Sequence, residues 1–422
     1  MAPRVKSKCR FCGAPIRSEF ADLGMQPVCE SYVEQNEITK GQVFYPLNVN
    51  FCEQCFLVQL QDAVTPQDLF DNYAYFSSHS PSWLKHAETY AEKITDKLGL
   101  DSNSQVVEIG SNDGYLLQYF SKTNIPVLGI EPAANVAEIA TKKGIPTKIA
   151  YFGISTSREL LAQNKQADLL IGNNILAQAP DLNGFVEGLK LLLKPKGVIT
   201  IEFHHLLQLM QKNQFDTLCH ERFSYFSFLT VEKIFSSHGL GIFDVEEIPT
   251  HSGSLRIYAR HSEDSSKPVS SNVSELRTIE ENAGLNQTKE YLLFGKKVKA
   301  IKRDLLAFLI KLKNDKKTIV GYGAHAEGHT FLNYCGVNSD FLDYTVDRNP
   351  FKQNKFLAGV NLPILNPDKV KETKPDFVLV LPWSIKSEIM TQIAYIGDWG
   401  GQFIVALPEL TLYNTNGERV NS

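Results

Sequence analysis

Four of the seven cysteines stand in two close pairs near the start of the chain. Cys9 and Cys12 form one C-x-x-C motif, and Cys52 and Cys55 form another. Each motif places two thiolates on one tight turn, so together they supply the four ligands of a tetrahedral zinc ion. No position is left open for a reactant, which predicts a structural metal. Free cysteines or a redox pair are the alternatives, although neither pair follows a strand and opens a helix as redox motifs do.

A second candidate site is the strand–turn–helix segment VVEIGSNDGYLLQYF at residues 106–120. It matches the acidic-x-G-x-G-x-G turn of methyltransferases, with asparagine at the middle glycine position. Glycines let the backbone approach a ligand closely, and the helix N-terminus attracts a carboxylate such as that of a methionine group. The residues that this turn offers to a cofactor are Glu108, Gly110, Asn112, Asp113 and Gly114.

An acidic residue also stands at the end of the next predicted strand. Glu131 follows Glu108 by 23 residues (131 − 108), where a carboxylate can accept both hydroxyls of a ribose. A turn that binds NAD has similar geometry, but the acidic residue before the first glycine favours S-adenosylmethionine (SAM). We therefore predict SAM as the cofactor, with Asn173 at the end of the fourth strand as a further contact.

The elements that must position these residues alternate between helical and strand-like runs, which is the α/β pattern. A length of 422 residues predicts two or three domains. We predict a zinc-binding domain at 1–75, a SAM-binding domain at 76–262 and a further α/β domain at 275–422. The central domain should contain a helix at 83–98 and strands at 105–109, 126–130, 168–172 and 197–203. His204 and His205 follow the last of these strands and are expected at the surface.

The polar stretch at 261–275 predicts a linker before the last domain. A long helical segment is predicted from about 275 to 314, with Gly284 and Gly295 as weak interruptions. Strands are then predicted at 317–321, 341–346, 376–381 and 402–406, with the DWGG turn of residues 398–401 before the last strand.

A glycine-rich turn, GYGAHAEG, opens the last domain and is typical of a phosphate-binding turn. A dehydrogenase is not favoured, because the nearest acidic residues, Asp340 and Asp347, do not stand at the usual spacing of about 20 residues after the turn.

Composition excludes several classes of protein. The formal net charge of −4 argues against a dedicated nucleic-acid binder, which usually carries a basic excess. No apolar run reaches the roughly 18 residues of a membrane span, and the basic N-terminus lacks the apolar segment of a signal peptide. Paired cysteines that suit a metal indicate a reducing compartment, so we expect a cytoplasmic protein with a small-molecule partner. The oligomeric state stays open.

Several stretches together resemble the three-domain, SAM-dependent sugar C-methyltransferases. They include CRFCG, YPLNVNFCEQCFLVQL, VVEIGSNDGYLL, GIEPAANVA, GNNILAQAPDLN, NQFDTLCHERFSYFS, HSGSLRIYA, YTVDRNPFKQNKFLAGVNLPI and DWGGQF. The resemblance covers nearly the whole chain in the same order. It implies an α/β protein with a small N-terminal zinc-binding domain, a central class I SAM methyltransferase (Rossmann-like) domain and a C-terminal Rossmann-like domain that binds a nucleotide sugar.

The resemblance also implies a reaction. The substrate is a nucleotide-linked 4-keto-deoxysugar, and a base removes the proton from the carbon beside the ketone. The resulting enediolate then attacks the methyl group of SAM, so the site needs a positioned base and stabilisation of an oxyanion. The substrate contacts that we predict are Asn174, Gln178, Arg348 and Lys352.

The central motif departs from the family pattern. The Tyr-His-Glu-His of the family is Cys219-His220-Glu221-Arg222 here, and Gln178 replaces a further family histidine. Arg222 stands at the position of the presumed base. Its pKa exceeds about 12, so it cannot accept a proton usefully.

Three hypotheses follow from this departure. In the first, which we favour, the enzyme still methylates carbon with Glu221, His220 or Tyr75 as the base. In the second, the same enediolate logic serves an epimerase-like reaction in which Arg222 stabilises an oxyanion or a carboxylate. In the third, the chain only binds SAM or a nucleotide sugar.

Overall fold

The computed structural model describes residues 7–61, 64–65 and 76–420, and these residues form two compact units. Unit 1 contains described residues within 1–17, 52–207 and 221–286. Unit 2 contains described residues within 18–51, 208–220 and 287–422. Each unit is therefore assembled from separate stretches of chain. The domain boundaries inferred from the sequence stay a prediction.

The main sheet of unit 1 has the strand order β11-β12-β9-β8-β5-β6-β7. Its strands are β5 (Val106–Ile109), β6 (Val127–Glu131), β7 (Thr147–Ile149), β8 (Ala167–Asn173), β9 (Leu193–His204), β11 (Leu240–Ile248) and β12 (Ser254–His261). The strands from β5 to β9 are parallel, and the β11–β12 hairpin joins β9 in antiparallel fashion. The chain returns across the sheet between β7 and β8, which makes the carboxyl ends of β5 and β8 a switch point where α/β sheets bind ligands.

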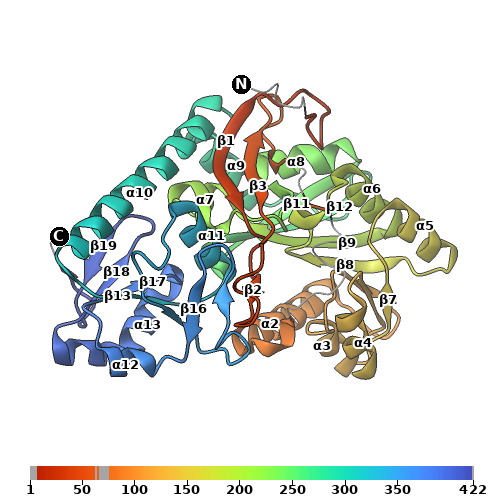
Figure 1. Cartoon of the computed structure of the whole chain (residues 1–422). Coiled ribbons are helices and arrows are strands. Elements are labelled where there is room, and N and C mark those ends of the chain that lie inside the picture. The colour runs from red at the N-terminus through yellow and green to blue at the C-terminus, as the bar shows by residue number, and fades with distance from the viewer. Residues whose placement is uncertain (1–6, 62–63, 66–75, 421–422) are drawn as a thin grey trace. The chain divides into compact units, whose positions relative to one another are not determined.

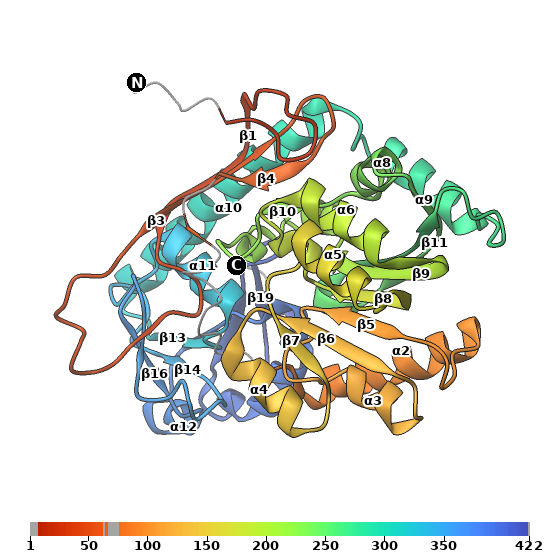
Figure 2. The ribbon, with the colours of Figure 1, turned by 90° about the vertical axis from the view of Figure 1, so that its right-hand side faces the viewer.

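Helices cover both faces of this sheet (Figure 2). The cores of the two faces use alternate strand residues, with Val106 on one side and Val107 on the other. One face carries α2 (Pro81–Leu98), α3 (Leu117–Lys122) and α4 (Ala134–Lys142). The other carries α5 (Ile154–Ala162), α6 (Leu182–Leu192), α8 (Phe228–Ser237) and α9 (Ser271–Asn282). Short turns of 3-10 helix lie at η1 (Ser77–His79), η2 (Leu176–Gln178) and η4 (Thr250–Ser252).

Local signals fix the predicted elements of unit 1. The Ser80 side chain accepts the Trp83 N–H at the start of α2, Pro81 occupies the first turn, and Gly99 ends the helix with a φ of 62°. The predicted helix at 83–98 and the four predicted strands of the central domain are confirmed.

Unit 2 contains a sheet with the strand order β2-β15-β16-β14-β13-β17-β18-β19-β20. Its strands are β2 (Tyr32–Val33), β13 (Ile319–Tyr322), β14 (Thr345–Val346), β15 (Phe356–Leu357), β16 (Leu362–Leu365), β17 (Phe377–Val380), β18 (Gln402–Val405), β19 (Thr411–Tyr413) and β20 (Arg419–Val420). The five neighbouring strands β16, β14, β13, β17 and β18 run parallel to one another. The strands predicted at 317–321, 376–381 and 402–406 are confirmed, whereas only the last two residues of the strand predicted at 341–346 form a strand, β14. The DWGG turn does precede β18, but β18 is not the last strand, because β19 and β20 follow it.

The helices of unit 2 include one of 27 residues, α10 (Thr288–Asn314), drawn as the long helix in Figure 1. The others are α11 (Ala326–Cys335), α12 (Lys369–Thr373), α13 (Lys386–Gln392), η3 (Phe215–Thr217), η5 (Trp383–Ile385) and η6 (Ala394–Trp399), while α7 (Leu206–Gln211) starts at the last two residues of a unit 1 stretch and continues into unit 2. No helix in the described part of the chain has the length and apolar character needed to cross a membrane.

The predicted helix at 275–314 is instead two helices, α9 and α10 (Thr288–Asn314). Gly284 separates them with a φ of 80°, whereas Gly295 does not interrupt α10. A side chain at Gly295 would place its Cβ 2.6 Å from the Phe20 carbonyl oxygen, so this glycine permits close packing. The predicted linker is shorter than expected, because β12 ends at His261 and α9 begins at Ser271.

The N-terminal strands divide between the units. In unit 2, β1 (Ser18–Gln26) pairs with antiparallel β3 (Tyr45–Phe51), and Phe20 stacks on Phe294 of α10 at 4.5 Å between ring centroids. In unit 1, β4 (Val58–Leu60) pairs with antiparallel β10 (Ser224–Tyr225). The residues expected to form one zinc-binding domain therefore contribute to both units.

Candidate functional site

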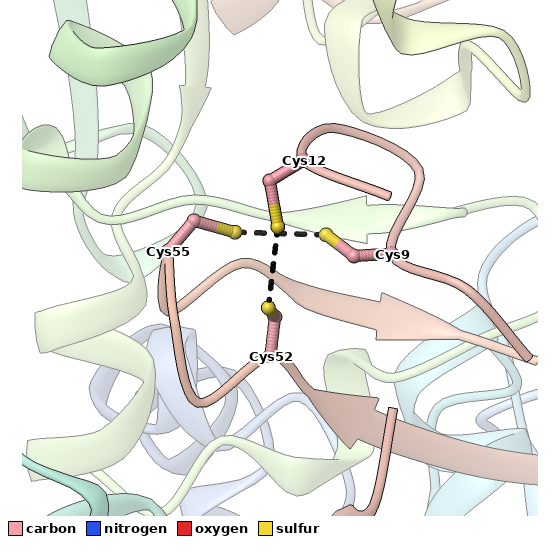
Figure 3. Close-up of side chains that lie close together, drawn as sticks. All are labelled: Cys9, Cys12, Cys52 and Cys55. Atoms are coloured by element: carbon pink, nitrogen blue, oxygen red, sulfur yellow. Dashed lines mark hydrogen bonds between the residues drawn. The ribbon is translucent and has the colours of Figure 1, made fainter. Parts of the chain in front are cut away.

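The four paired cysteines point toward one another (Figure 3). The sulfur atoms of Cys9 and Cys55 are 3.5 Å apart, as are those of Cys12 and Cys52, and all four lie within 4.8 Å of one another. A zinc ion with bonds of about 2.3 Å requires sulfur atoms separated by roughly 3.8 Å. The donor set and its spacing therefore fit a structural zinc ion.

The two C-x-x-C turns are built alike. The Cys9 carbonyl accepts the Gly13 N–H at 3.0 Å, and the Cys52 carbonyl accepts the Phe56 N–H at 2.8 Å. Gly13 and Phe56, each following the second cysteine of its motif, have φ values of 72° and 64°. A left-handed residue at this point turns the chain back under the sulfur atoms, at a steric cost for Phe56 that glycine avoids.

The cysteine cluster also supports strand β10, which carries part of a pocket described below. Strand β4 follows the second turn and pairs with β10. The Gln59 amide of β4 donates to the Cys9 sulfur at 3.3 Å, and the Thr230 hydroxyl donates to the Cys55 carbonyl at 3.1 Å. A metal in this cluster would thus fix the position of β10.

The predicted cofactor turn has the backbone geometry of a close approach. Gly110 and Gly114 have φ values of 68° and 77°. A Cβ at Gly110 would lie 3.0 Å from the Ile175 side chain, and one at Gly114 would lie 3.1 Å from Ile145. Both positions therefore require glycine for conformation and for space.

Asn112, at the middle glycine position, also has a left-handed backbone, with a φ of 48°. Asparagine tolerates this conformation better than other residues with side chains, which explains the substitution. Its N–H donates to Glu131 at 2.9 Å, and its side-chain oxygen accepts the Ser77 N–H at 2.9 Å. The second oxygen of Glu131 accepts the Ala133 N–H at 2.9 Å, so the carboxylate is held at the turn.

Two further acidic residues of the turn are buried. Neither oxygen of Glu108, nor Oδ1 of Asp113, has a hydrogen-bond partner among the described residues. Burial raises the pKa of Glu108 well above its usual range, and the nearby carboxylates of Glu131 and Asp113 raise it further. The other oxygen of Asp113 contacts the Lys143 ammonium at 3.1 Å. Unpaired buried acceptors suit a ligand that brings hydroxyl and ammonium donors, so the turn fits SAM.

A small pocket lies at the carboxyl ends of β8 and β9. Its polar lining consists of Asn174, His204, Arg222, Ser224 and Tyr225. Asn174 has a φ of 58°, and its buried side-chain oxygen finds no partner in the described structure. The preceding residue, Asn173, donates to the Tyr115 hydroxyl at 3.3 Å. Strand ends at this edge of the sheet thus present polar groups beside the cofactor turn.

Arg222 and His204 contact each other in this pocket. Nη1 of Arg222 lies 3.3 Å from Nδ1 of His204, and Nη2 lies 3.4 Å from Nε2. The neighbouring His205 is 1% exposed and pairs with the buried Glu280 at 2.7 Å. The expectation of two surface histidines is therefore wrong for His205. It fails because Glu280 provides a buried partner from a helix 75 residues away in sequence.

The other residues of the altered motif have different environments. His220 is buried, its Nε2 has no hydrogen-bond partner in the part of the chain described, and its ring lies edge-on to Tyr45. Burial lowers the pKa of His220. Cys219 is also buried, Glu221 is half-buried, and the predicted base candidate Tyr75 lies outside the described residues.

The remaining predicted substrate contacts lie in both units. Gln178 ends η2, next to a residue that lines the pocket. In unit 2, the Lys352 ammonium donates to the Ala324 carbonyl at 3.0 Å, beside the turn that follows β13. Arg348 forms an exposed ion pair with Glu388 at 3.2 Å. The structure thus brings the Lys352 ammonium to the glycine-rich turn of unit 2.

The strand order of unit 1 and its cofactor turn define a class I SAM-dependent methyltransferase. Models described as "Putative zinc binding domain", "Methyltransferase domain" and "C-methyltransferase C-terminal domain" match residues 9–70, 83–245 and 249–408. The C-methyltransferase NovU of Streptomyces niveus is 31% identical over 402 residues, which cover 95% of this chain and 96% of that protein. The chain therefore belongs to the three-domain C-methyltransferase family.

Solved structures of methyltransferases also resemble part of the chain. A SAM-dependent methyltransferase of Clostridium acetobutylicum is 13% identical, with a TM-score of 0.33, over 42% of this chain and 92% of that one. The magnesium protoporphyrin IX methyltransferase of Synechocystis, with bound S-adenosylhomocysteine, is 15% identical with a TM-score of 0.33, over 42% and 83% of the two chains. The strand order remains the basis of the fold assignment.

The predicted family, fold class, SAM-dependent methyltransferase activity and cofactors, SAM and structural zinc, are confirmed. The roles of individual site residues stay predictions. Sequence reasoning missed His204 as a pocket residue. Its position directly after the fifth strand of the central sheet was the available signal, because ligands bind at the carboxyl ends of such strands.

Proposed function

We propose that this methyltransferase adds a methyl group to the carbon beside the ketone of a nucleotide-linked 4-keto-deoxysugar, through an enediolate. The observation that carries the proposal is the pocket at the ends of β8 and β9, which contains a guanidinium group. The related NovU is itself named a C-methyltransferase. Methyl transfer to carbon requires a carbanion equivalent, and a ketone makes the neighbouring proton acidic enough to remove.

Arg222 is suited to the charge that develops in this reaction. Its guanidinium lines the pocket and can bind the enediolate oxygen, which is neutral in the ketone and negative after deprotonation. An interaction that strengthens as charge develops accelerates the step. SAM would supply the methyl group, held by the turn at Gly110–Gly114 and by Glu131.

The proposed substrate contacts are polar side chains near the pocket of unit 1 and basic side chains of unit 2. The buried side-chain oxygen of Asn174 can accept a sugar hydroxyl, and Gln178 stands beside the same pocket. Arg348 and Lys352 remain the proposed contacts for the diphosphate of the nucleotide. A nucleotide sugar is a cytoplasmic metabolite, which agrees with the compartment expected from the paired cysteines.

The test is an NMR assay of purified protein with a dTDP-linked 4-keto-6-deoxyhexose and SAM labelled with carbon-13 in its methyl group. We expect a new carbon–methyl signal and one equivalent of S-adenosylhomocysteine. Deuterium uptake beside the ketone with no consumption of SAM would indicate the epimerase-like alternative. Binding of both compounds without any turnover would indicate the binding-only alternative, and either result would overturn the proposal.

A further inference from the structure

Arg10, which lies within the first C-x-x-C turn, connects the cysteine cluster to the pocket of unit 1. Its Nη1 donates to the Leu60 carbonyl at 3.0 Å, and its Cζ lies over the Phe223 ring, 5.4 Å from the centroid. Phe223 is buried and stands between Arg222 and Ser224, two residues that line the pocket. One side chain of the cysteine turn therefore contacts both β4 and the segment that carries the pocket.

Backbone groups join the same parts of unit 1. The Arg10 N–H donates to the Gln59 side-chain oxygen at 3.0 Å, and Gln59 is the antiparallel strand partner of Ser224. The Leu60 N–H donates to the Phe223 carbonyl at 3.0 Å. Hydrogen bonds thus link the first cysteine turn to β4, and β4 to the residues of the altered motif and β10.

A guanidinium is suited to this place between a carbonyl group and an aromatic ring. It carries donors for the carbonyl oxygen, and its positive charge is attracted to the electron-rich face of the ring. Because Arg10 follows Cys9 directly in the sequence, its side chain starts from a backbone that the cysteine cluster holds. A shift of Phe223 away from β4 would weaken both its hydrogen bond to Leu60 and its contact with Arg10.

We propose that Arg10 is a positioning residue that directs the Arg222 guanidinium into the pocket by holding Phe223 against β4; this inference rests on the proposed function. Arg222 binds the enediolate oxygen in that proposal, and the charge on this oxygen forms only as the proton leaves. A displacement of about 1 Å in such a group can lower the rate about 100-fold, because its effect depends on alignment. Arg10 thus acts on the chemical step through Arg222, without contacting the reactants.

The experiment compares the chemical step with substrate binding. Zinc-loaded Arg10→Ala is assayed by NMR for methyl transfer from SAM to a dTDP-linked 4-keto-6-deoxyhexose. Deuterium uptake beside the ketone is followed in D2O with S-adenosylhomocysteine in place of SAM. We expect kcat and the exchange rate to fall about 10- to 100-fold, while the KM for the sugar stays within about twofold of the wild type. Zinc content and SAM affinity should also match the wild type.

The double variant Arg10→Ala/Arg222→Ala separates positioning from a general effect on folding. If Arg10 acts through Arg222, the double variant should exchange protons no more slowly than Arg222→Ala alone, because the group to be positioned is gone. Arg10→Lys, which keeps a cation and a donor, should regain most of the lost rate. Arg17→Ala is the matched control, because Arg17 is an exposed arginine soon after the same cysteine turn. Its rates should equal those of the wild type.

A second variant tests the ring contact from the other side. Phe223→Leu removes the aromatic ring beside Arg10 and keeps an apolar side chain. It should lower kcat and the exchange rate in the same way, with little change in KM. This variant keeps the proposal testable if Arg10→Ala folds poorly, and urea unfolding of every variant identifies conditions in which all of them are folded.

Failure of this inference is distinguishable from failure of the proposed function. Losses that add in the double variant, or an unchanged exchange rate in folded Arg10→Ala or Phe223→Leu, would overturn the role of Arg10 and leave the proposed function intact. A wild-type protein that binds S-adenosylhomocysteine yet exchanges no proton would overturn the proposed function, and the role of Arg10 with it.

Discussion

Each unit contains a turn after its first parallel strand that donates a backbone N–H to an acidic residue at or just after the end of the next strand. In unit 1, the turn after β5 donates the Asn112 N–H to Glu131, which ends β6. In unit 2, the turn after β13 donates the Ala324 N–H to Asp347, which follows β14, at 2.8 Å. In both cases the second carboxylate oxygen accepts the N–H two residues further on, from Ala133 and Asn349 respectively.

The surroundings of the two turns differ in their polar groups. Side chains of unit 2 already bond to its turn, because the Ala324 carbonyl accepts hydrogen bonds from the Tyr32 hydroxyl at 2.8 Å and from the Lys352 ammonium at 3.0 Å. The turn of unit 1 keeps the Glu108 oxygens unpaired among the described residues. The unpaired buried atoms at the turn of unit 1 are carboxylate oxygens, whereas the one at the turn of unit 2 is a ring nitrogen, Nδ1 of His325, among the described residues.

The comparison shows that strand, turn and acidic residue define a place where a nucleotide can bind, and do not by themselves make a binding site. The kind of unpaired polar atom around the turn decides which group of a ligand it can bind.

The largest effect should come from removing the zinc ion, for which unit 1 offers four cysteine ligands. The described residues of unit 2 contain no comparable group of ligands. Cys12→Ser should abolish stoichiometric zinc and lower the free energy of unfolding by several kcal/mol, since zinc contributes roughly 10 kcal/mol or more in isolated fingers. Metal analysis and urea unfolding measure both quantities. Cys335→Ala, which removes a buried thiol outside the cluster, should retain its zinc. A variant that loses zinc at no cost in stability would contradict the structural role.

The next-largest effect should come from Asp216, a buried carboxyl group of unit 2 that makes stability depend on pH. Burial, and then the Glu327 carboxylate, raise the pKa of Asp216 to about 7 from its usual value of 3.8. The folded state therefore keeps a proton that the unfolded state loses above pH 4, so stability falls as the pH rises from about 4 to 7. Asp216→Asn retains an acceptor for the Trp383 N–H and removes this penalty.

The variant should exceed the wild type by up to about 4 kcal/mol at pH 8, and the difference should disappear near pH 4. Urea unfolding at several pH values measures it, with Asp340→Asn at an exposed position as the control. A difference that does not change with pH would show that folding does not raise the pKa of Asp216.

The two carboxylates of the matched turns provide the most direct test. Glu131→Gln should weaken SAM binding about 10- to 100-fold, because charge-assisted hydrogen bonds contribute about 1.5–3 kcal/mol. Asp347→Asn, the equivalent change in unit 2, should leave SAM affinity unchanged. Isothermal titration calorimetry measures both. Equal losses in the two variants would mean that the turns do not have separate roles.

Much of this arrangement could be predicted from the sequence, for reasons that are local. The spacing from Glu108 to Glu131 reflects one strand, one helix and the next strand, and the C-x-x-C pairs impose their own turns. Gly284 also correctly indicated a break between two helices. Such signals need only neighbouring residues, and the structure reproduces them.

Contacts between distant parts of the sequence could not be predicted. Gly295 resembles a helix breaker until Phe20 is seen to pack against it, and His205 resembles a surface residue until Glu280 is placed beside it. The same holds for Asp347, which the sequence spacing discounted although pairing of β13 with β14 puts it at the turn. Each error came from a partner that only the fold supplies.

The smallest effect concerns Arg348, which we propose as a diphosphate contact although the structure shows it in an ion pair with Glu388. Both side chains are more than half exposed, so Arg348→Ala should change the free energy of unfolding by less than about 1 kcal/mol. If the guanidinium binds the diphosphate, the KM for the nucleotide sugar should rise while SAM affinity stays constant. Glu388→Ala, which releases Arg348 from its partner, should not raise KM. An unchanged KM in Arg348→Ala would leave Lys352 as the proposed basic contact of unit 2, and would indicate that the exposed pair belongs to the surface alone.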